Sequence, residues 1–161
     1  MRMIGITFAA LAFACTSTIA TAQTAKDLVG TWKNVKNTST TPDGKTTDVF
    51  GPKANGIAIF TSDGHFAIVN LNPQTPKFAA NARDKGTAEE NKAAVAGGIG
   101  LFGTYTIANK VLMLKTEGST YPNWTGTEQK RDITKYGPNE FTWTLTNSLG
   151  AKGEVTWQRV K

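Results

Sequence analysis

The sequence predicts an all-β domain whose short strands follow one another as a meander, and two observations carry this prediction. Segments in which apolar and polar residues alternate recur along the chain. Turn-forming residues such as Ser62, Asp63 and Gly64 separate these segments at short spacing. Such a meander forms either a sandwich or a closed up-and-down barrel, and closure removes the exposed sheet edges altogether.

About nine strands are expected, in pairs that are adjacent in sequence. Pro42, Asp43 and Gly44 precede the second strand, whereas Asn109 and Lys110 join a later pair as a tight hairpin. The expected strands cover residues 28–35, 46–50, 56–61, 65–71, 103–108, 111–116, 127–133, 141–146 and 154–160.

One segment between the fourth and fifth expected strands is helical in character instead. Residues 88–96 are rich in alanine and glutamate. Thr87 is placed as an N-cap with Glu90 three residues later, the capping-box arrangement, and two glycines from Gly97 on stop the helix. Because its apolar residues are mostly alanine, this helix buries little area. It is interpreted either as a lid or as a plain crossover connection.

The first 22 residues have the features of a signal peptide. Arg2 is followed by an apolar run from Met3 to Ala14, and the segment ends in the small-x-small pattern before Ala22. Residues 23–161 are then a single domain, exported to the periplasm or secreted. The apolar run is too short to span a bilayer, so no stable membrane insertion is expected.

Cysteine and histidine are too few for several kinds of chemistry. Cys15, the only cysteine, lies in the signal segment, and His65 is the only histidine. Disulfides are therefore excluded from the mature domain, a metal site with Cys and His ligands is not expected, and no cofactor is predicted. One histidine and the absence of a GxSxG motif also argue against a nucleophilic triad.

The chain is basic, but its charge is dispersed. Lys and Arg total 18, and removing Arg2 with the signal leaves 17 against 12 Asp and Glu, a net charge of +5. The lysines occur singly along the chain and form no basic stripe. Nucleic acid is therefore not an expected partner.

Several motifs in order resemble one family. Gly30, Thr31 and Trp32 look like the Gly-x-Trp signature of lipocalins, and the order GTWK, a DG hairpin, PKF, a GTAEE helix, FGTYTI and PNWTGTEQKR is similar to the bacterial and fungal lipocalin-like domain family. The match covers about residues 27–160. The resemblance implies a closed antiparallel up-and-down β-barrel of about 8–10 strands with an interior cavity, and with the short helix at about 88–96 inserted between strands.

The sequence departs from that family before the PNW loop. Family members often carry histidine in this strand, whereas this chain has Met113 and Leu114. The departure argues against a histidine-dependent reaction here and predicts an apolar bottom of the pocket.

The strand TEQKRDI has a polar side chain on each face. In a closed barrel successive side chains alternate between interior and exterior. One face carries Thr127, Gln129, Arg131 and Ile133, and the other carries Glu128, Lys130, Asp132 and Thr134. The second set is almost fully charged and belongs in water, so Gln129 and Arg131 are predicted to point inward.

An inward guanidinium needs a partner, because burial of an isolated charge is costly. A protein carboxylate, water or an anionic ligand would supply it, and the planar fork of Arg131 suits a carboxylate or phosphate. The alternative is that Arg131 stacks on Trp32 and closes the barrel base, as an arginine does in the lipocalins it resembles. Arg159 in the last strand competes for that role, and we assign the barrel-closing position to Arg159 and Trp32.

Other side chains have two interpretations each. Tyr105 either offers its hydroxyl to the lumen or belongs to the core. Trp143 faces inward as core or cavity wall, and Trp124 with Tyr121 either covers the barrel mouth or packs outside. His65 is expected near a strand end, partly in water. The predicted ligand-binding residues are Arg131, Gln129, Tyr105, Trp124, Trp143 and Met113.

Three classes of function follow. The first is binding of a small, mainly apolar or amphipathic molecule with a polar or acidic headgroup inside the barrel. The second is an isomerase or cyclase in which Arg131 and Tyr105 polarise a carbonyl or enol. The third is a filled barrel that acts through its loops as an interaction or inhibitor protein. Binding is ranked first.

Overall fold

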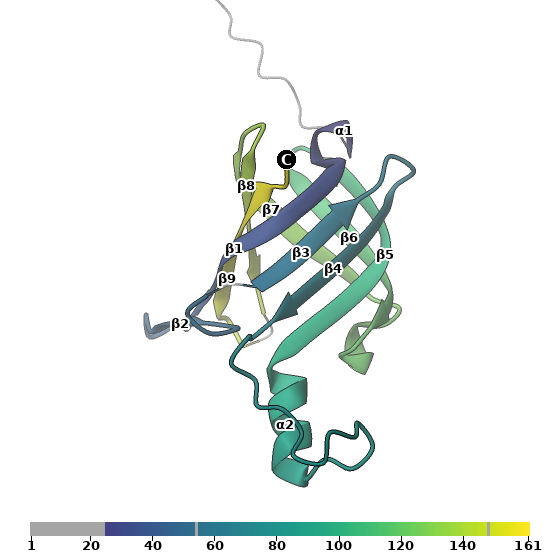
Figure 1. Cartoon of the computed structure of the whole chain (residues 1–161). Helices are drawn as coiled ribbons and strands as arrows, with labels where there is room; N and C mark the ends of the chain where they lie inside the picture. The colour runs from purple at the N-terminus through teal and green to yellow at the C-terminus, as the bar shows by residue number, and fades with distance from the viewer. Residues whose placement is uncertain (1–24, 54, 148) are drawn as a thin grey trace, which may run out of the picture.

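The computed structural model describes residues 25–53, 55–147 and 149–161, and the predicted signal peptide lies outside these residues. As predicted, the domain is an antiparallel β-barrel with one short helix between strands (Figure 1). Its strands are β1 (Gly30–Thr40), β2 (Thr46–Asp48), β3 (Asn55–Phe60), β4 (His65–Leu71), β5 (Gly98–Ala108), β6 (Val111–Ser119), β7 (Glu128–Tyr136), β8 (Glu140–Thr146) and β9 (Lys152–Arg159).

The barrel closes because β1 pairs on both of its edges. The described strands form one sheet in the order β2-β1-β3-β4-β5-β6-β7-β8-β9, and β1 also pairs with β9, for example Trp32 with Arg159. The first residues of β1 pair with β3, from Gly30 to Lys33, and its last three pair with β2. Eight strands therefore make the ring, and β2 is an extra strand beside it.

The turns that join neighbouring strands follow the predicted chemistry. Asn109 and Lys110 have φ of 51° and 65°, the left-handed conformation of a tight two-residue hairpin. Gly64 has φ of 87° in the turn between β3 and β4, where a residue with a Cβ would be strained. These turns hold consecutive strands in register, from Phe60 with Phe66 to Ala108 with Val111.

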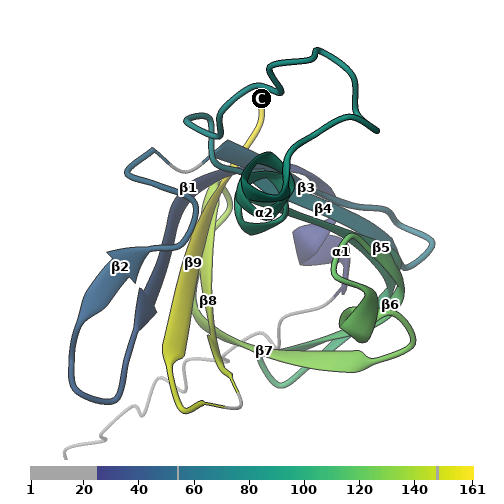
Figure 2. The same ribbon diagram turned by 90° about the horizontal axis from the view of Figure 1, so that it is seen from below.

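One end of the barrel is closed by α1 (Ala25–Leu28) (Figure 2). Aromatic side chains fill the barrel at this end. Leu28 is fully buried, and its carbonyl accepts a hydrogen bond of 2.7 Å from Trp32 Nε1. Trp32 and Phe60 each meet Phe141, with ring centroids 4.6 and 6.5 Å apart. This end is therefore a packed core with large rings rather than a cavity.

The predicted helix is present as α2 (Ala88–Ala96), with the capping box between Thr87 and Glu90. None of its residues is buried, as its alanine content implies. It lies at the end of the barrel opposite α1, and the short η1 (Pro122–Trp124) lies at the same end (Figures 1 and 2). Among the described helices, none combines the length and apolar character needed to cross a bilayer.

Candidate functional site

A cavity of about 270 Å³ lies inside the barrel at the end away from α1. Ile68, Leu101, Leu114 and Val155 form its apolar walls. The inward positions at this end carry smaller side chains than those beside α1, for example Gly153 in β9. The aromatic core reaches this end only as far as Trp143, whose ring centroid lies 5.5 Å from that of Phe141 and which also lines the cavity.

Arg131 is the only charged side chain that lines this cavity within the described residues. It is 9% exposed, and the strand alternates as predicted, with Lys130 and Asp132 outside. Its Nη1 donates to the Lys130 carbonyl at 2.8 Å, and its Nη2 donates to Gln129 Oε1. None of the ion pairs found among the described residues includes Arg131.

Burial lowers the pKa of Arg131 to about 10. The guanidinium is therefore still charged at neutral pH, although the surrounding protein disfavours the charge. Its two hydrogen bonds go to neutral oxygens, so the positive charge is not neutralised by the described protein groups.

Three further polar atoms near this site are buried without a hydrogen-bond partner. They are Gln129 Nε2, Trp143 Nε1 and Asn70 Oδ1, and Trp143 and Asn70 line the cavity. An unpaired buried polar atom costs free energy, so Trp143 Nε1 and Asn70 Oδ1 are available to a polar group in the cavity. Trp143 Nε1 is a donor and Asn70 Oδ1 an acceptor, and the positive charge of Arg131 favours an anionic group over a cationic one.

Trp124 and Trp143 both line the cavity. Trp124 in η1 is partly buried and lines the cavity at its mouth, with its ring centroid 5.6 Å from that of Tyr121. Trp143 in β8 is buried and forms part of the wall, and it pairs with Ile133, the next inward residue of β7 after Arg131.

Three predicted ligand-binding residues do not line the cavity. Gln129 is half-buried and accepts a hydrogen bond from Arg131 through Oε1, but it is not part of the cavity wall. Met113 lies on the outer face of β6, since its neighbours Leu112 and Leu114 point inward, so Leu114 forms the wall in its place. Tyr105 points inward, but its hydroxyl donates to the carbonyls of Thr61 and Ala25 at 3.0 and 3.4 Å and it does not line the cavity. Tyr105 therefore belongs to the packed end beside α1.

Arg159 and Trp32 stack against each other at the closed end. The guanidinium carbon of Arg159 lies 4.0 Å from the centroid of the Trp32 ring, a cation–π geometry. Arg159 also donates to the carbonyls of Asp27, Val29 and Pro138, each at 2.8 Å. Arg159, rather than Arg131, ties α1 to the barrel.

The single histidine lies away from the cavity. His65 begins β4 and is largely exposed, with Nδ1 3.3 Å from the Asp63 carboxylate. In the part of the chain that the structure describes, no cluster of three His, Cys, Asp or Glu side chains is placed to hold a metal ion.

Some cavity residues were not singled out from the sequence. Asn70 follows the inward residues Phe66 and Ile68 by strict alternation in β4, so the same periodicity that placed Arg131 would have found it. Phe50 lines the mouth from the connection between β2 and β3, where no strand period applies. No local signal in the sequence predicts that position.

The fold and the cavity define a small barrel protein with an interior cavity. Residues 29–160 match the lipocalin-like domain family, and the chain belongs to that family. No functionally curated protein matches the chain.

Among solved structures, the chain is similar to designed barrels. A redesigned beta barrel is 21% identical with a TM-score of 0.45, covering 88% of this chain and 98% of that one. A redesigned beta barrel bound to DFHBI is 26% identical with a TM-score of 0.41, covering 84% and 98%. A de novo designed fluorescence-activating beta barrel is 13% identical with a TM-score of 0.43, covering 84% and 96%.

Proposed function

We propose that this protein binds a small, mainly apolar molecule with an acidic headgroup in the cavity opposite α1. The observation that carries the proposal is the buried Arg131, which is charged, lines the cavity and pairs with none of the described carboxylates. A bound carboxylate would accept from the planar fork of Arg131 and neutralise its charge.

The remaining lining is consistent with an apolar ligand body. Most of the wall is aliphatic or aromatic, and polar groups are few, which is typical of small-molecule sites. Its volume of about 270 Å³ lies just below the range of about 300–1,000 Å³ that is typical of small-molecule sites. The cavity therefore accommodates a small ligand or part of a larger one.

The cavity supports a binding protein over a filled barrel that works only through its loops. The isomerase or cyclase alternative needed Arg131 and Tyr105 on one substrate. Tyr105 instead uses its hydroxyl on two backbone carbonyls and does not line the cavity. Binding is therefore the function that the geometry supports best.

Sodium octanoate is the probe for the first test, with affinity measured by isothermal titration calorimetry. Arg131→Met removes the charge inside the barrel, and Lys130→Met removes the same charge from the next residue on the exposed face. Because a hydrogen bond to a charged group contributes about 1.5–3 kcal/mol, we expect Arg131→Met to weaken binding about tenfold to a hundredfold. Lys130→Met should bind as the wild type does.

Equal affinities of the two variants, with both folded, would contradict the role of Arg131. No binding of octanoate and no small acid recovered by organic extraction of the purified protein would contradict the proposed function as a whole. Native mass spectrometry before extraction detects any molecule that stays bound.

We also propose that the protein acts outside the cytoplasm, because residues 1–22 have the composition of a signal peptide. N-terminal sequencing of the protein from culture medium or periplasm tests this. The expected first residue is Gln23, and an intact Met1 would contradict export by cleavage.

A further inference from the structure

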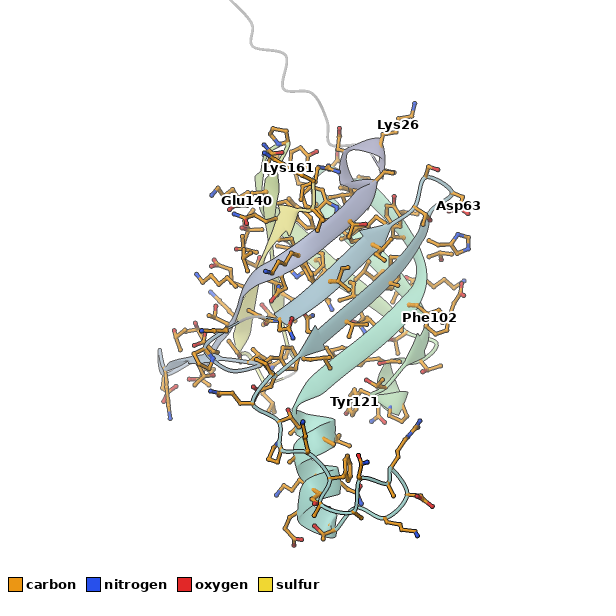
Figure 3. All side chains as sticks on the ribbon, viewed as in Figure 1. Lys26, Asp63, Phe102, Tyr121, Glu140 and Lys161 are labelled. Carbon is orange, nitrogen blue, oxygen red and sulfur yellow. The ribbon has the colours of Figure 1, made fainter. Side chains whose placement is uncertain are left out.

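A second apolar space lies outside the barrel mouth, between α2 and the segment around η1. It is a groove of about 600 Å³. Large apolar side chains that line it are exposed, namely Val95 at 73%, Leu71 at 49% and Tyr121 at 45%. Figure 3 shows Tyr121 at this end of the barrel, far from Lys26 and Asp63 at the other.

This groove adjoins the interior cavity. Phe50, Ile99 and Trp124 line both spaces. Phe50 comes from the connection between β2 and β3, Ile99 from the beginning of β5, and Trp124 from η1. Three side chains from three separate segments are thus the boundary between the cavity that contains Arg131 and the groove beside α2.

We propose that the ligand is a long-chain carboxylic acid whose headgroup binds at Arg131 and whose chain leaves the barrel between Phe50, Ile99 and Trp124 to lie in the groove beside α2. This inference rests on the proposed function and names the class of ligand for the same site. The hydrocarbon chain of the ligand covers Val95, Leu71 and Tyr121, which are exposed to solvent in the protein alone.

Volume and shape both favour an unbranched chain. The inner cavity is small, at about 270 Å³, against about 300–1,000 Å³ for typical small-molecule sites, so a long-chain acid must extend past its mouth. An unbranched chain passes between three side chains with less displacement than a fused ring system does. The groove beyond is lined mainly by apolar side chains and glycine, so it suits a hydrocarbon and offers no charged partner for a second polar group.

Helix α2 forms one side of the groove. The capping box at Thr87 and Glu90 fixes where the helix begins, and the helix buries none of its own residues against the barrel. It presents Ala94, Val95 and Ala96 to the groove. An exposed valine on a helix with little other apolar surface is explained if a ligand covers it.

The test measures the dissociation constants of hexanoate, octanoate, decanoate, dodecanoate and tetradecanoate, each below its critical micelle concentration. Full burial of one methylene strengthens binding by up to about fourfold. Because the groove is open on one side and buries each methylene only in part, we expect roughly a twofold gain per methylene. We expect affinity to rise through the whole series rather than to stop at the length that fills the inner cavity.

Val95→Ser and Leu71→Ser test the groove itself. Both side chains are exposed at present, so folding should survive. Each substitution should weaken the binding of tetradecanoate about threefold or more and change the affinity for octanoate less than twofold. The matched control is Val35→Ser, because Val35 is also exposed, at 40%, and lies outside both spaces. It should change neither affinity.

The outcomes separate this inference from the proposed function. Binding of octanoate that depends on Arg131, with no further gain for longer acids, would overturn the groove and leave the cavity in place. Equal affinities of Val95→Ser and Val35→Ser for tetradecanoate would overturn the groove in the same way. Failure of every acid in the series would overturn both.

Discussion

Replacement of Arg131 by methionine should stabilise the protein while it weakens binding, and the structure sets the size of both effects. Burial lowers the pKa of Arg131 from its ordinary value to about 10. At 1.36 kcal/mol for each tenfold change in proton affinity, the fold disfavours the charged form by about 3 kcal/mol. Methionine fills a similar volume and removes this cost.

The substitution also removes two hydrogen bonds, to the Lys130 carbonyl and to Gln129 Oε1. At about 1 kcal/mol each, they reduce the expected gain to about 1 kcal/mol. For a domain of this size that corresponds to a rise in Tm of about 4 °C.

Thermal and urea unfolding at pH 7 measure the change, with Lys130→Met as the control for loss of one positive charge. Lys130 forms an exposed ion pair with Asp132, and such a pair contributes little to stability. The Tm of Lys130→Met should therefore differ from that of the wild type by about 1 °C or less. A drop of several degrees for Arg131→Met would show that Arg131 is a structural group, and it would refute the argument that its charge is kept for a ligand.

Four other outcomes follow from the same contacts. Arg131 is protonated below pH about 10 in the free protein, so above that pH octanoate binding must take up a proton. Its dissociation constant should then rise about tenfold per pH unit in calorimetry, whereas Arg131→Met should show no such slope. Trp143→Phe removes a buried unpaired N–H, and we expect octanoate affinity to fall about twofold to tenfold. Because the smaller ring also leaves a gap beside Phe141 and Trp157, thermal unfolding should show a lower Tm. Arg159→Ala removes three carbonyl contacts and the stacking on Trp32, so urea unfolding should show a loss of about 2–3 kcal/mol with octanoate affinity unchanged. Thr87→Ala removes the N-cap of α2, and amide exchange of that helix should speed up by about fivefold, equivalent to about 1 kcal/mol.

The parts of the fold that were predictable depend on local chemistry. The turn at Asn109 and Lys110, the turn at Gly64 and the capping box at Thr87 each act within a few residues, so their sequence signals are sufficient. The period of two along β7 likewise put Arg131 inside, because strand geometry alone sets which side chains share a face.

The candidate site was predictable only in part, for a related reason. Alternation predicts which face a residue lies on but not how far along the barrel axis it sits. Tyr105 points inward, in agreement with strand alternation, yet its hydroxyl donates to carbonyls near α1 and does not reach the cavity. Met113 was assigned to the pocket from its apolar character, although its own strand placed Leu112 and Leu114 inward.

The sequence by itself determined the strands, their turns, the helix and the inward direction of Arg131, because these follow from contacts between residues close in the chain. Only the tertiary structure decided the register in which β1 and β9 pair, that the Tyr105 hydroxyl lies beside α1 rather than in the cavity, and that Phe50, Ile99 and Trp124 meet at one mouth. These three facts depend on strand register and barrel tilt, which bring distant segments together and which no local pattern encodes.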